Sequence, residues 1–388
     1  MDTTRVLIAG GGVAALEAAL ALHALAQERV QLTLLAPEPE LVYRPAQVAE
    51  PFGRSTVRHF GLAELAGEFG AGVIRGALSG VDPQARIAWA DDGSLLGYDA
   101  LVIACGARPG EAVRGALTFA GEGADVRGLL AELQSGSVRR VVFAVPAGAG
   151  WPLPAYELAL LTAAHLATRE ARERITLALV TPEPQPLPAF GREPGEAVER
   201  LLAEAGIELH THRTPISFAA GVLRLAPEGS IGADRVVALP RLRGEPITGI
   251  PHDGDGFIRT DRHGRVDGLD GVYAAGDVTA FPVKQGGLAT QQADAVAEAI
   301  AAACGVEIEP APFTPVLRGM LLTGGEPLII RNEPIGGAGD RSTVSRQPLW
   351  WPPSKIAGRH LAPFLAAHDL EIRPPPDGAL AVEHTLTG

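Results

Sequence analysis

The sequence predicts an α/β protein with two similar αβ blocks and a C-terminal extension. The first block is a βαβ unit of about 30 residues, in which apolar runs at residues 5–9 and 30–35 flank an alanine-rich segment. The second block repeats this alternation of apolar runs and helical segments over residues 129–210. A chain of 388 residues has room for two to three domains, so we expect the blocks to form separate sheets.

The remaining elements follow from local patterns. Between Val73 and Cys105, apolar runs separated by the turn sequences VDPQ and DDGS predict an antiparallel excursion that returns to a buried strand. A strand over 271–277 and a long helix over 286–303 come later, and beyond Pro310 we expect a few strands and one or two short helices. The second block is predicted to contain a helix that includes Leu129–Leu133, a strand over Val141–Val145, a helix over Tyr156–Arg169, a strand over Ile175–Val180, a proline-rich loop over 181–195, a helix over Ala197–Ala205 and a strand over Ile207–His210.

Composition and charge exclude several classes of function. With 33 basic and 45 acidic residues the net charge is −12, which argues against a nucleic-acid-binding protein. The two cysteines, Cys105 and Cys304, lie too far apart for a CxxC pair and are too few for a cysteine zinc site or a disulfide framework. The chain runs at once into a strand, and it has no run of about 18 apolar residues, so we expect a soluble cytoplasmic protein.

The first chemical signal is the turn at residues 10–15 (GGGVAA), which has the pattern GxGxxA. Gly10 permits a tight turn, and Gly12 lets a pyrophosphate approach the backbone. The helix that follows presents unpaired N–H groups and the positive end of its dipole to phosphates. The expected phosphate-side residues are Gly10, Gly12, Val13, Ala14 and Ala15, the last being small enough for close packing of helix on strand.

The segment TDRHGRVDGLDGVYAAGD (260–277) resembles the two-dinucleotide-binding-domain flavoproteins, the FAD-dependent pyridine nucleotide-disulfide oxidoreductase superfamily. The resemblance implies that Asp277 binds the ribityl chain of FAD and that Gly276 lies beside it. Residues 98–109 resemble the family's strand that ends in Thr-Gly, with Cys105 and Gly106 at those positions. We expect Cys105 to be a small buried residue rather than a nucleophile.

Residues 281–300 closely resemble the segment after Gly-Asp in sulfide:quinone reductases, flavocytochrome c sulfide dehydrogenases and type II NADH dehydrogenases. Two glycines open a helix there, and its N–H groups and dipole suit the pyrimidine edge of a reduced, anionic flavin. The expected contacts at this helix start are Lys284, Gln285, Gly286, Gly287 and Leu288.

Three candidates have a second interpretation. Glu38, the acid nearest the end of the second strand, binds the ribose or is a solvated loop charge. Lys284, the candidate catalytic residue, places a positive charge near the flavin ring or is a solvated lysine. Residues 41–53 resemble the loop that brings a proline beside the isoalloxazine, which makes Arg44 and Pro45 cofactor-side candidates; the alternative is an ordinary X-Pro turn.

The middle of the chain departs from the family. NAD(P)H-dependent relatives carry a second GxGxxG after the strand VVFAV (141–145), but here Pro146 follows and no helix is expected directly after Gly148 and Gly150. The segment looks more like that of sulfide:quinone reductases, without their reactive cysteines. Because polysulfide chemistry needs thiolates, sulfide oxidation by that route is disfavoured, and NAD(P)H is only weakly supported as a second cofactor.

Two further features carry less weight. His210 and His212 share one face of a strand, but no further ligands are suggested nearby, so we expect no metal site. Trp350 and Trp351, with basic residues close by, predict either an apolar patch for peripheral contact with the inner face of the membrane or a structural cap or homodimer surface.

The sequence therefore predicts an FAD-dependent oxidoreductase with two Rossmann-like (FAD/NAD(P)-binding) domains. The FAD-binding domain is expected over residues 1–112 and 248–308, the second domain over 113–247 and the extension over 309–388. A bound flavin would transfer electrons from a small-molecule donor to a quinone or other small acceptor. The alternatives are an NAD(P)H dehydrogenase of the same fold and a non-catalytic flavin-binding sensor or interaction protein.

Overall fold

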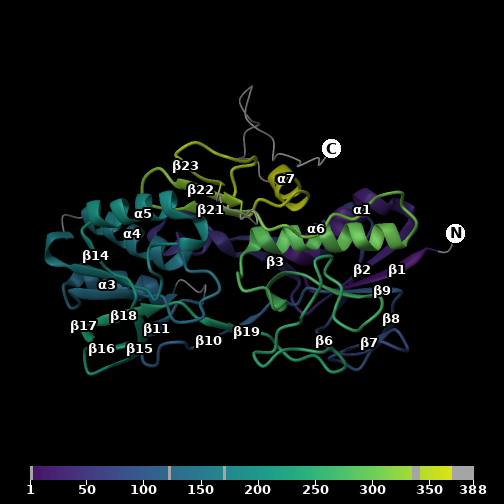
Figure 1. Cartoon of the computed structure of the whole chain (residues 1–388), viewed down its shortest axis with the longest axis horizontal. Helices are drawn as coiled ribbons and strands as arrows, with labels where there is room; N and C mark the ends of the chain where they lie inside the picture. Colours follow the sequence, from purple (N-terminus) through teal and green to yellow (C-terminus); the bar gives the residue numbers. More distant parts are fainter. Residues whose placement is uncertain (1–2, 121–123, 169–171, 334–340, 369–388) are drawn as a thin grey trace.

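Two parallel five-stranded sheets form the centres of two domains (Figure 1). The computed structural model describes residues 3–120, 124–168, 172–333 and 341–368. The first sheet has the order β20-β9-β1-β2-β5, and every neighbouring pair is parallel. Its strands are β1 (Thr4–Ala9), β2 (Val30–Ala36), β5 (Gly72–Arg75), β9 (Ala100–Ile103) and β20 (Val272–Ala274). Because β20 follows the whole second sheet in sequence, the first domain is discontinuous, as predicted.

Two alanine-rich helices, α1 (Val13–Ala26) and α6 (Gly286–Ala303), cover one face of the first sheet side by side (Figure 1). Their buried contact is made largely of alanines such as Ala18, Ala293 and Ala297, whose small side chains let the helices approach closely. The other face is covered by the predicted antiparallel excursion, β6 (Leu78–Asp82), β7 (Ile87–Ala90) and β8 (Leu95–Gly97). The hairpin β3 (Glu40–Tyr43) and β4 (Arg58–Gly61) leads into α2 (Leu62–Glu68).

The second sheet has the order β11-β18-β12-β13-β14, again with parallel neighbours. Its central strands are buried on both faces, which explains their continuous apolar runs. The strands are β11 (Leu117–Thr118), β12 (Arg140–Ala144), β13 (Thr176–Val180), β14 (Ile207–His210) and β18 (Arg235–Ala238), with helices α3 (Ala124–Ser135), α4 (Leu153–Ala167) and α5 (Arg192–Glu204). A small antiparallel sheet of β15 (Thr214–Ala219), β16 (Val222–Ala226) and β17 (Ser230–Gly232) is attached to this domain.

Where the chain passes between the domains, β10 (Arg108–Gly110) pairs with β19 (Arg241–Arg243) in an antiparallel ribbon. The predicted boundaries at 112/113 and 247/248 fall shortly after these two strands. Short 3-10 turns occur at Gln27–Arg29, Arg44–Ala46, Glu50–Phe52, Arg172–Arg174, Pro188–Phe190 and Gly276–Val278.

Two predicted helix starts were wrong. Helix α4 begins at Leu153 rather than Tyr156, and α5 begins at Arg192 rather than Ala197. In both cases prolines led the prediction to end the loop too late. Pro154 and Pro194 lie in the first turns of these helices, where a missing N–H breaks no hydrogen bond.

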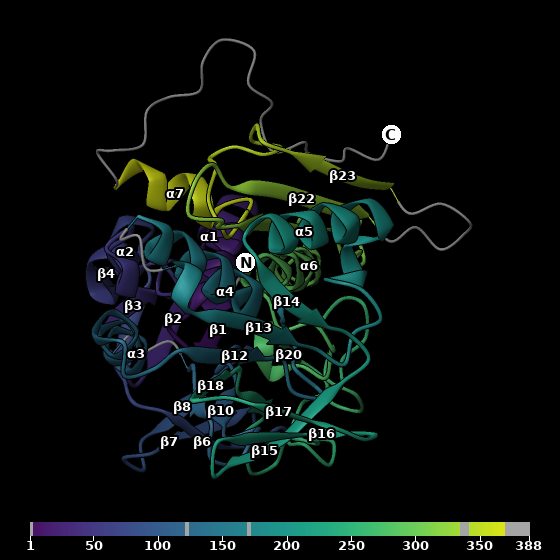
Figure 2. The ribbon, with the colours of Figure 1, turned by 90° about the vertical axis from the view of Figure 1, so that its left-hand side faces the viewer.

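The C-terminal extension forms the three-stranded sheet β21 (Leu317–Leu321), β22 (Leu328–Glu333) and β23 (Arg341–Ser345), followed by α7 (Leu361–Ala367). Figure 2 shows this sheet lying over α5, and its inner residues join the core of the second domain. Trp350 corrects the prediction of an exposed apolar patch: it is 3% exposed and packs with Ile329 and Ala357. Its indole N–H donates to the carbonyl of Ser354 at 2.9 Å, so Trp350 is a structural residue inside the extension.

Candidate functional site

The turn between β1 and α1 has the shape that a phosphate-binding loop requires. Gly10 has φ +139°, and a Cβ atom there would lie 2.3 Å from the carbonyl oxygen of Ala104 on the neighbouring strand. A Cβ atom at Gly12 would meet nothing within 4 Å, so open space lies in front of the helix start. Gly12 is the N-cap and supplies no side-chain hydrogen bond, which leaves the first N–H groups of α1 to a ligand.

The predicted ribityl-binding residue lies next to this turn. A Cβ atom at Gly276 would be 3.0 Å from Cβ of Ala14 and 3.5 Å from Cβ of Ala289, so the starts of α1 and α6 meet at the Gly276–Val278 turn. Burial raises the pKa of the Asp277 carboxyl, while Lys284 and Arg44 oppose this rise. No hydrogen bond to this carboxyl is made by the described residues, so its oxygens are left for ligand hydroxyls.

The structure also places the loop that carries Arg44 and Pro45 near the cofactor side. The charge of Arg44 acts on the pKa of Asp277, so residues 44–46 lie on the same side of the first domain as the predicted ribityl-binding residue. Glu38 is exposed, two residues beyond the end of β2, and its assignment to the ribose stays a prediction. Gly106 follows β9 with φ +75° and open space around its Cα.

Cys105 is a correction, because its side chain is exposed rather than buried. It lies directly after β9, beside Gly10, and its thiol donates to the carbonyl of Ala9 at 3.3 Å. Desolvation by the surrounding protein atoms nevertheless raises the pKa of the thiol to about 12. The thiol is therefore protonated at neutral pH, as expected of a residue that is not a nucleophile.

The start of α6 differs in detail from the prediction. The amide of Leu288 donates to the carbonyl of Gln285 at 3.0 Å and its side chain is buried, so Gly286 and Gly287 are the residues whose amides are left to face a flavin. The Gln285 side chain is also engaged, since its Nε2 donates to the carbonyl of Arg318 at 2.6 Å. This contact joins the helix start to β21.

Lys284 makes contacts that the sequence did not predict. Its Nζ donates to the carbonyl oxygens of Asp277, at 3.1 Å, and of Thr279, and lies 3.7 Å from the centroid of the Phe257 ring. The side chain is 8% exposed, and burial lowers its pKa to about 8. It is therefore not a solvated loop lysine, and its placement near the flavin ring stays a prediction.

The corresponding turn in the second domain is longer, and part of it packs against other protein segments. Residues 145–152 separate β12 from α4, and Gly150 lies against Lys284: a Cβ atom at Gly150 would be 2.5 Å from the Lys284 Cγ. The acid beyond the end of β13, Glu183, accepts hydrogen bonds from the hydroxyls of Tyr156, at 2.7 Å, and Thr181, at 2.8 Å. Gly150 and Glu183 are therefore engaged by protein atoms, whereas a Cβ atom at Gly148 would meet nothing within 4 Å.

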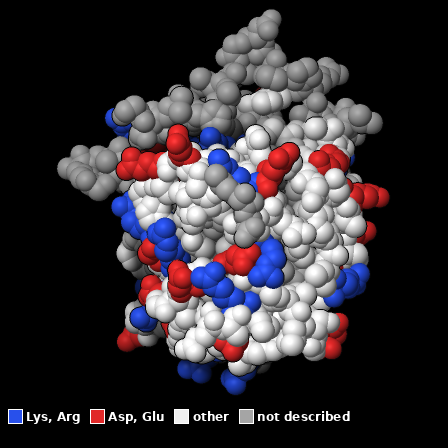
Figure 3. Space-filling model, turned by 90° about the vertical axis from the view of Figure 1, so that its right-hand side faces the viewer, with Lys and Arg blue, Asp and Glu red and all other residues white. Residues whose placement is uncertain are grey.

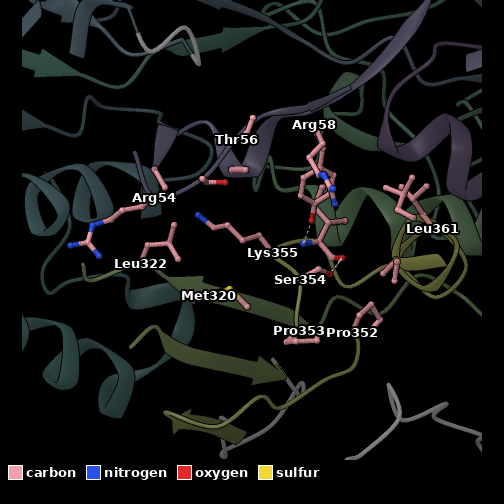
Figure 4. Close-up of a pocket in the computed structure, with 18 of the residues that line it drawn as sticks. Arg54, Thr56, Arg58, Met320, Leu322, Pro352, Pro353, Ser354, Lys355 and Leu361 are labelled. Atoms are coloured by element: carbon pink, nitrogen blue, oxygen red, sulfur yellow. Dashed lines mark hydrogen bonds between the residues drawn. The ribbon is translucent and has the colours of Figure 1, made fainter. Parts of the chain in front are cut away.

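A cavity of about 430 Å³, which we call the C-terminal cavity, lies between the loop after β3, α4 and the extension (Figure 4). Ile356 connects its wall to the flavin side, because its amide donates to the Tyr43 hydroxyl at 3.2 Å and its side chain contacts Gly286. The apolar lining includes Phe60, Leu161, Met320, Leu322, Leu361, Leu365, Pro352 and Pro353, and the polar lining includes Tyr43, Arg54, Arg58, Ser354 and Lys355.

A buried ion pair stands at this cavity and was not predicted. Lys355 Nζ lies 2.6 and 2.7 Å from the two carboxylate oxygens of Glu157, which also accepts the amide of Leu322 at 2.9 Å. Glu157 is fully buried, and burial raises its pKa while Lys355 opposes the rise. A signal existed in the sequence, since Glu157 is the one carboxylate in the apolar segment that forms α4.

The residues present fit FAD. A glycine turn with open space, a half-buried carboxyl without a hydrogen-bond partner among the described residues, and free amides at a second helix start match pyrophosphate, ribityl and pyrimidine groups in turn. Among the described residues no group of His, Cys, Asp and Glu could hold a metal ion, and no described helix is long and apolar enough to cross a membrane. On the face in Figure 3, basic and acidic side chains are interspersed.

Fold and site together define a two-domain flavoprotein oxidoreductase. Residues 4–303 match the family model of the pyridine nucleotide-disulphide oxidoreductases, so the chain belongs to that family and is an FAD-dependent oxidoreductase.

Known proteins that resemble this chain have different partners. It is 30% identical over 323 residues to the ferredoxin reductase component of chlorobenzene dioxygenase from Cupriavidus sp. (strain PS12), covering 76% of this chain and 74% of that protein. It is 28% identical over 215 residues to sulfide-quinone reductase from Aquifex aeolicus (strain VF5), covering 52% and 49%. The solved structure of the sulfide:quinone oxidoreductase from Aquifex aeolicus matches with a TM-score of 0.81 at 20% identity, over 89% of this chain and 87% of that one.

Proposed function

We propose that this FAD-dependent oxidoreductase reduces an apolar, quinone-like acceptor bound in the C-terminal cavity. The observation that carries the proposal is a mainly apolar cavity with a buried ion pair in its wall, next to the start of α6. FAD, when bound, supplies the electron chemistry of such a reaction. The similarity to a sulfide-quinone reductase supports the acceptor class.

The lining residues suit the acceptor in two ways. Leucine, methionine and proline side chains remove a flat apolar ring from water, which favours binding. Reduction of a quinone adds two electrons and two protons, and negative charge develops on its oxygens. Lys355, held by Glu157, is one of the cations in the wall, and it can stabilise such charge and hold a proton beside it. Tyr43 and Ile356 keep the extension closed over the helix start.

The contacts of the second domain favour an electron donor other than a pyridine nucleotide. The long turn at 145–152, the contact of Gly150 with Lys284 and the engaged carboxylate of Glu183 all oppose nucleotide binding in the second domain. Sulfide is also disfavoured as the electron donor, because the exposed thiol of Cys105 is protonated and has no second thiol beside it. The similarity to a ferredoxin reductase component favours the second candidate, an NAD(P)H-dependent reductase of a protein acceptor.

The test is reoxidation of the photoreduced protein by a short-chain ubiquinone under anaerobic conditions. Leu322→Trp, which fills the cavity, is expected to slow reoxidation about tenfold or more, while the flavin spectrum stays unchanged. Ile216→Trp, on the exposed edge strand β15, is the matched control. Equal reoxidation rates in all three proteins would contradict the proposal.

A further inference from the structure

We propose that Lys284 is a positioning residue that holds the Asp277 turn in place for FAD and joins this turn to the second domain. The proposal rests on the assignment of Asp277 to the ribityl chain, and does not depend on the identity of donor or acceptor.

The Gly276–Val278 turn is held at both ends. At its beginning, the amide of Gly276 donates to Oε1 of Gln292 on α6 at 2.7 Å. At its end, the ammonium of Lys284 binds the carbonyls of Asp277 and Thr279, and the Thr279 hydroxyl donates to the carbonyl of Gly276 at 2.9 Å. The backbone on both sides of Asp277 is thereby fixed, so the point from which its side chain extends is fixed too.

The surroundings of Lys284 are those of a structural clamp. Its contacts in the described part of the chain are carbonyl oxygens and the Phe257 ring rather than a carboxylate at ion-pair distance. Burial of a cation in such a place is costly unless its donors are used, and here two carbonyls and an aromatic face use them. A compact ammonium fits this arrangement, whereas the planar fork of arginine does not. This fits a sequence in which Lys284 and Lys355 are the two lysines.

The clamp also acts on the charge of Asp277. Burial raises the pKa of this carboxyl, and Lys284 is the first of the two cations that oppose the rise, before Arg44. The acids that face Lys284 are Asp277 and Asp253, and the 145–152 turn adds no charged residue. Loss of the Lys284 charge therefore raises the pKa of Asp277 further. A protonated carboxyl accepts hydrogen bonds from ribityl hydroxyls less well than a carboxylate does.

The same residue connects the two domains. The amide of Lys284 donates to the carbonyl of Gly150 at 3.0 Å, and its side-chain stem fills the space where a Cβ of Gly150 would be. The second-domain turn thus packs on the clamp from behind. This contact gives Gly150 a reason to be glycine that has nothing to do with a second nucleotide.

The experiment is equilibrium binding of FAD to the apoprotein, followed by quenching of flavin fluorescence over a series of pH values below about pH 8. Lys284→Met keeps the stem against Gly150 and removes the charge. We expect it to weaken FAD binding about tenfold at neutral pH, and to shift the acidic loss of affinity to higher pH. Lys284→Arg keeps a charge, so its acidic loss should stay at the wild-type position. Arg259→Met, an exposed arginine two residues beyond Phe257, is the control for loss of a positive charge.

A cycle with Asp277→Asn separates positioning from a general structural role. If Lys284 acts through Asp277, Lys284→Met should cost less than about threefold in affinity once Asp277 is asparagine. An unshifted pH profile in Lys284→Met, or an undiminished effect in the Asp277→Asn background, would overturn the proposal. Wild-type FAD affinity in Asp277→Asn alone would instead overturn the ribityl assignment on which the proposal rests.

Discussion

The turn after β1 in the first domain and the turn after β12 in the second both connect a parallel strand to a helix, but their surroundings differ. In the first domain residues 10–12 connect β1 to α1, and the space in front of Gly12 is open. In the second domain residues 145–152 connect β12 to α4, and Gly150 is packed on Lys284. The acids that follow the next strands, β2 and β13, also differ in their surroundings. Glu38 is exposed, whereas Glu183 accepts hydrogen bonds from Tyr156 and Thr181.

This difference shows that a dinucleotide-binding topology can be kept while part of the turn packs against the protein itself. In the second domain the helices α4 and α5 instead support the C-terminal sheet, and Glu157 of α4 holds Lys355 at the C-terminal cavity. In our proposal, one domain binds the cofactor and the other builds the wall of a second site.

The largest effect is expected from Gly10→Ala. The new Cβ would lie 2.3 Å from the Ala104 carbonyl at a φ of +139°, so the turn must distort. We expect a loss of more than about 3 kcal/mol in stability and loss of bound FAD, measured by thermal unfolding and flavin content. Gly148→Ala, at φ +74° with open space around it, should cost about 1–2 kcal/mol and leave the flavin content unchanged. Similar losses in both variants would contradict the contrast.

The ion pair of the second domain should have the next largest effect. Lys355→Met leaves Glu157 buried without its cation, which costs about 3–5 kcal/mol when one partner is removed. Unfolding in denaturant measures this loss. The double variant with Glu157→Gln should recover much of the stability, because no unpaired charge then remains. A double variant as unstable as Lys355→Met would show that the pair is not the cause.

Gly150→Ala tests the packing of the second turn on Lys284. A Cβ atom 2.5 Å from Cγ of Lys284 forces one of the two segments to move, at a cost of about 1–3 kcal/mol in thermal unfolding. In a Lys284→Ala background the closest contact, with Cγ, is removed and only the contact with Cβ at 2.9 Å remains, so Gly150→Ala should cost less there. Additive effects of the two substitutions would mean that the segments are not coupled.

The smallest effect concerns pH and the first domain. Asp294 on α6 and Glu17 on α1 are buried close together, and burial together with Glu17 raises the pKa of Asp294 well above its ordinary value. Because the folded-state pKa lies above the unfolded one, stability is highest below the unfolded pKa and falls as pH rises through the folded one, by at most about 1.4 kcal/mol per pH unit. The Asp294→Asn variant should lose less stability than the wild type as pH rises, as measured by thermal unfolding at a series of pH values. An identical pH dependence in the variant would contradict it.

Much of the fold followed from the sequence, because it depends on local patterns. Buried strands such as β12 and β13 read as continuous apolar runs, and the glycine turn at residues 10–12 carries its own signature. The family followed from Asp277 and the segment after it, which lie in one short stretch of chain. Helix starts were less predictable where a proline occupies the first turn, as Pro154 and Pro194 do.

Contacts between distant segments could not be predicted. Glu157 and Lys355 are far apart in sequence, and Lys284 meets Gly150 only because the second domain folds against the first. The exposure of Cys105 and the burial of Trp350 likewise depend on what covers them rather than on neighbouring residues. Glu157 lies in a segment that resembles sulfide:quinone reductases, but nothing in the sequence pairs it with Lys355, so the C-terminal cavity emerged only in three dimensions.

The most direct test of the central claim, that only the first domain takes a dinucleotide, is anaerobic addition of NADH and NADPH to the purified yellow protein. The visible absorption of the oxidised flavin reports the outcome. We expect that neither nucleotide bleaches this band rapidly, although the same sample can be photoreduced and then reoxidised by a quinone. Rapid bleaching by either nucleotide would contradict this claim, because the second domain would then bind a nicotinamide nucleotide despite the packing of its 145–152 turn.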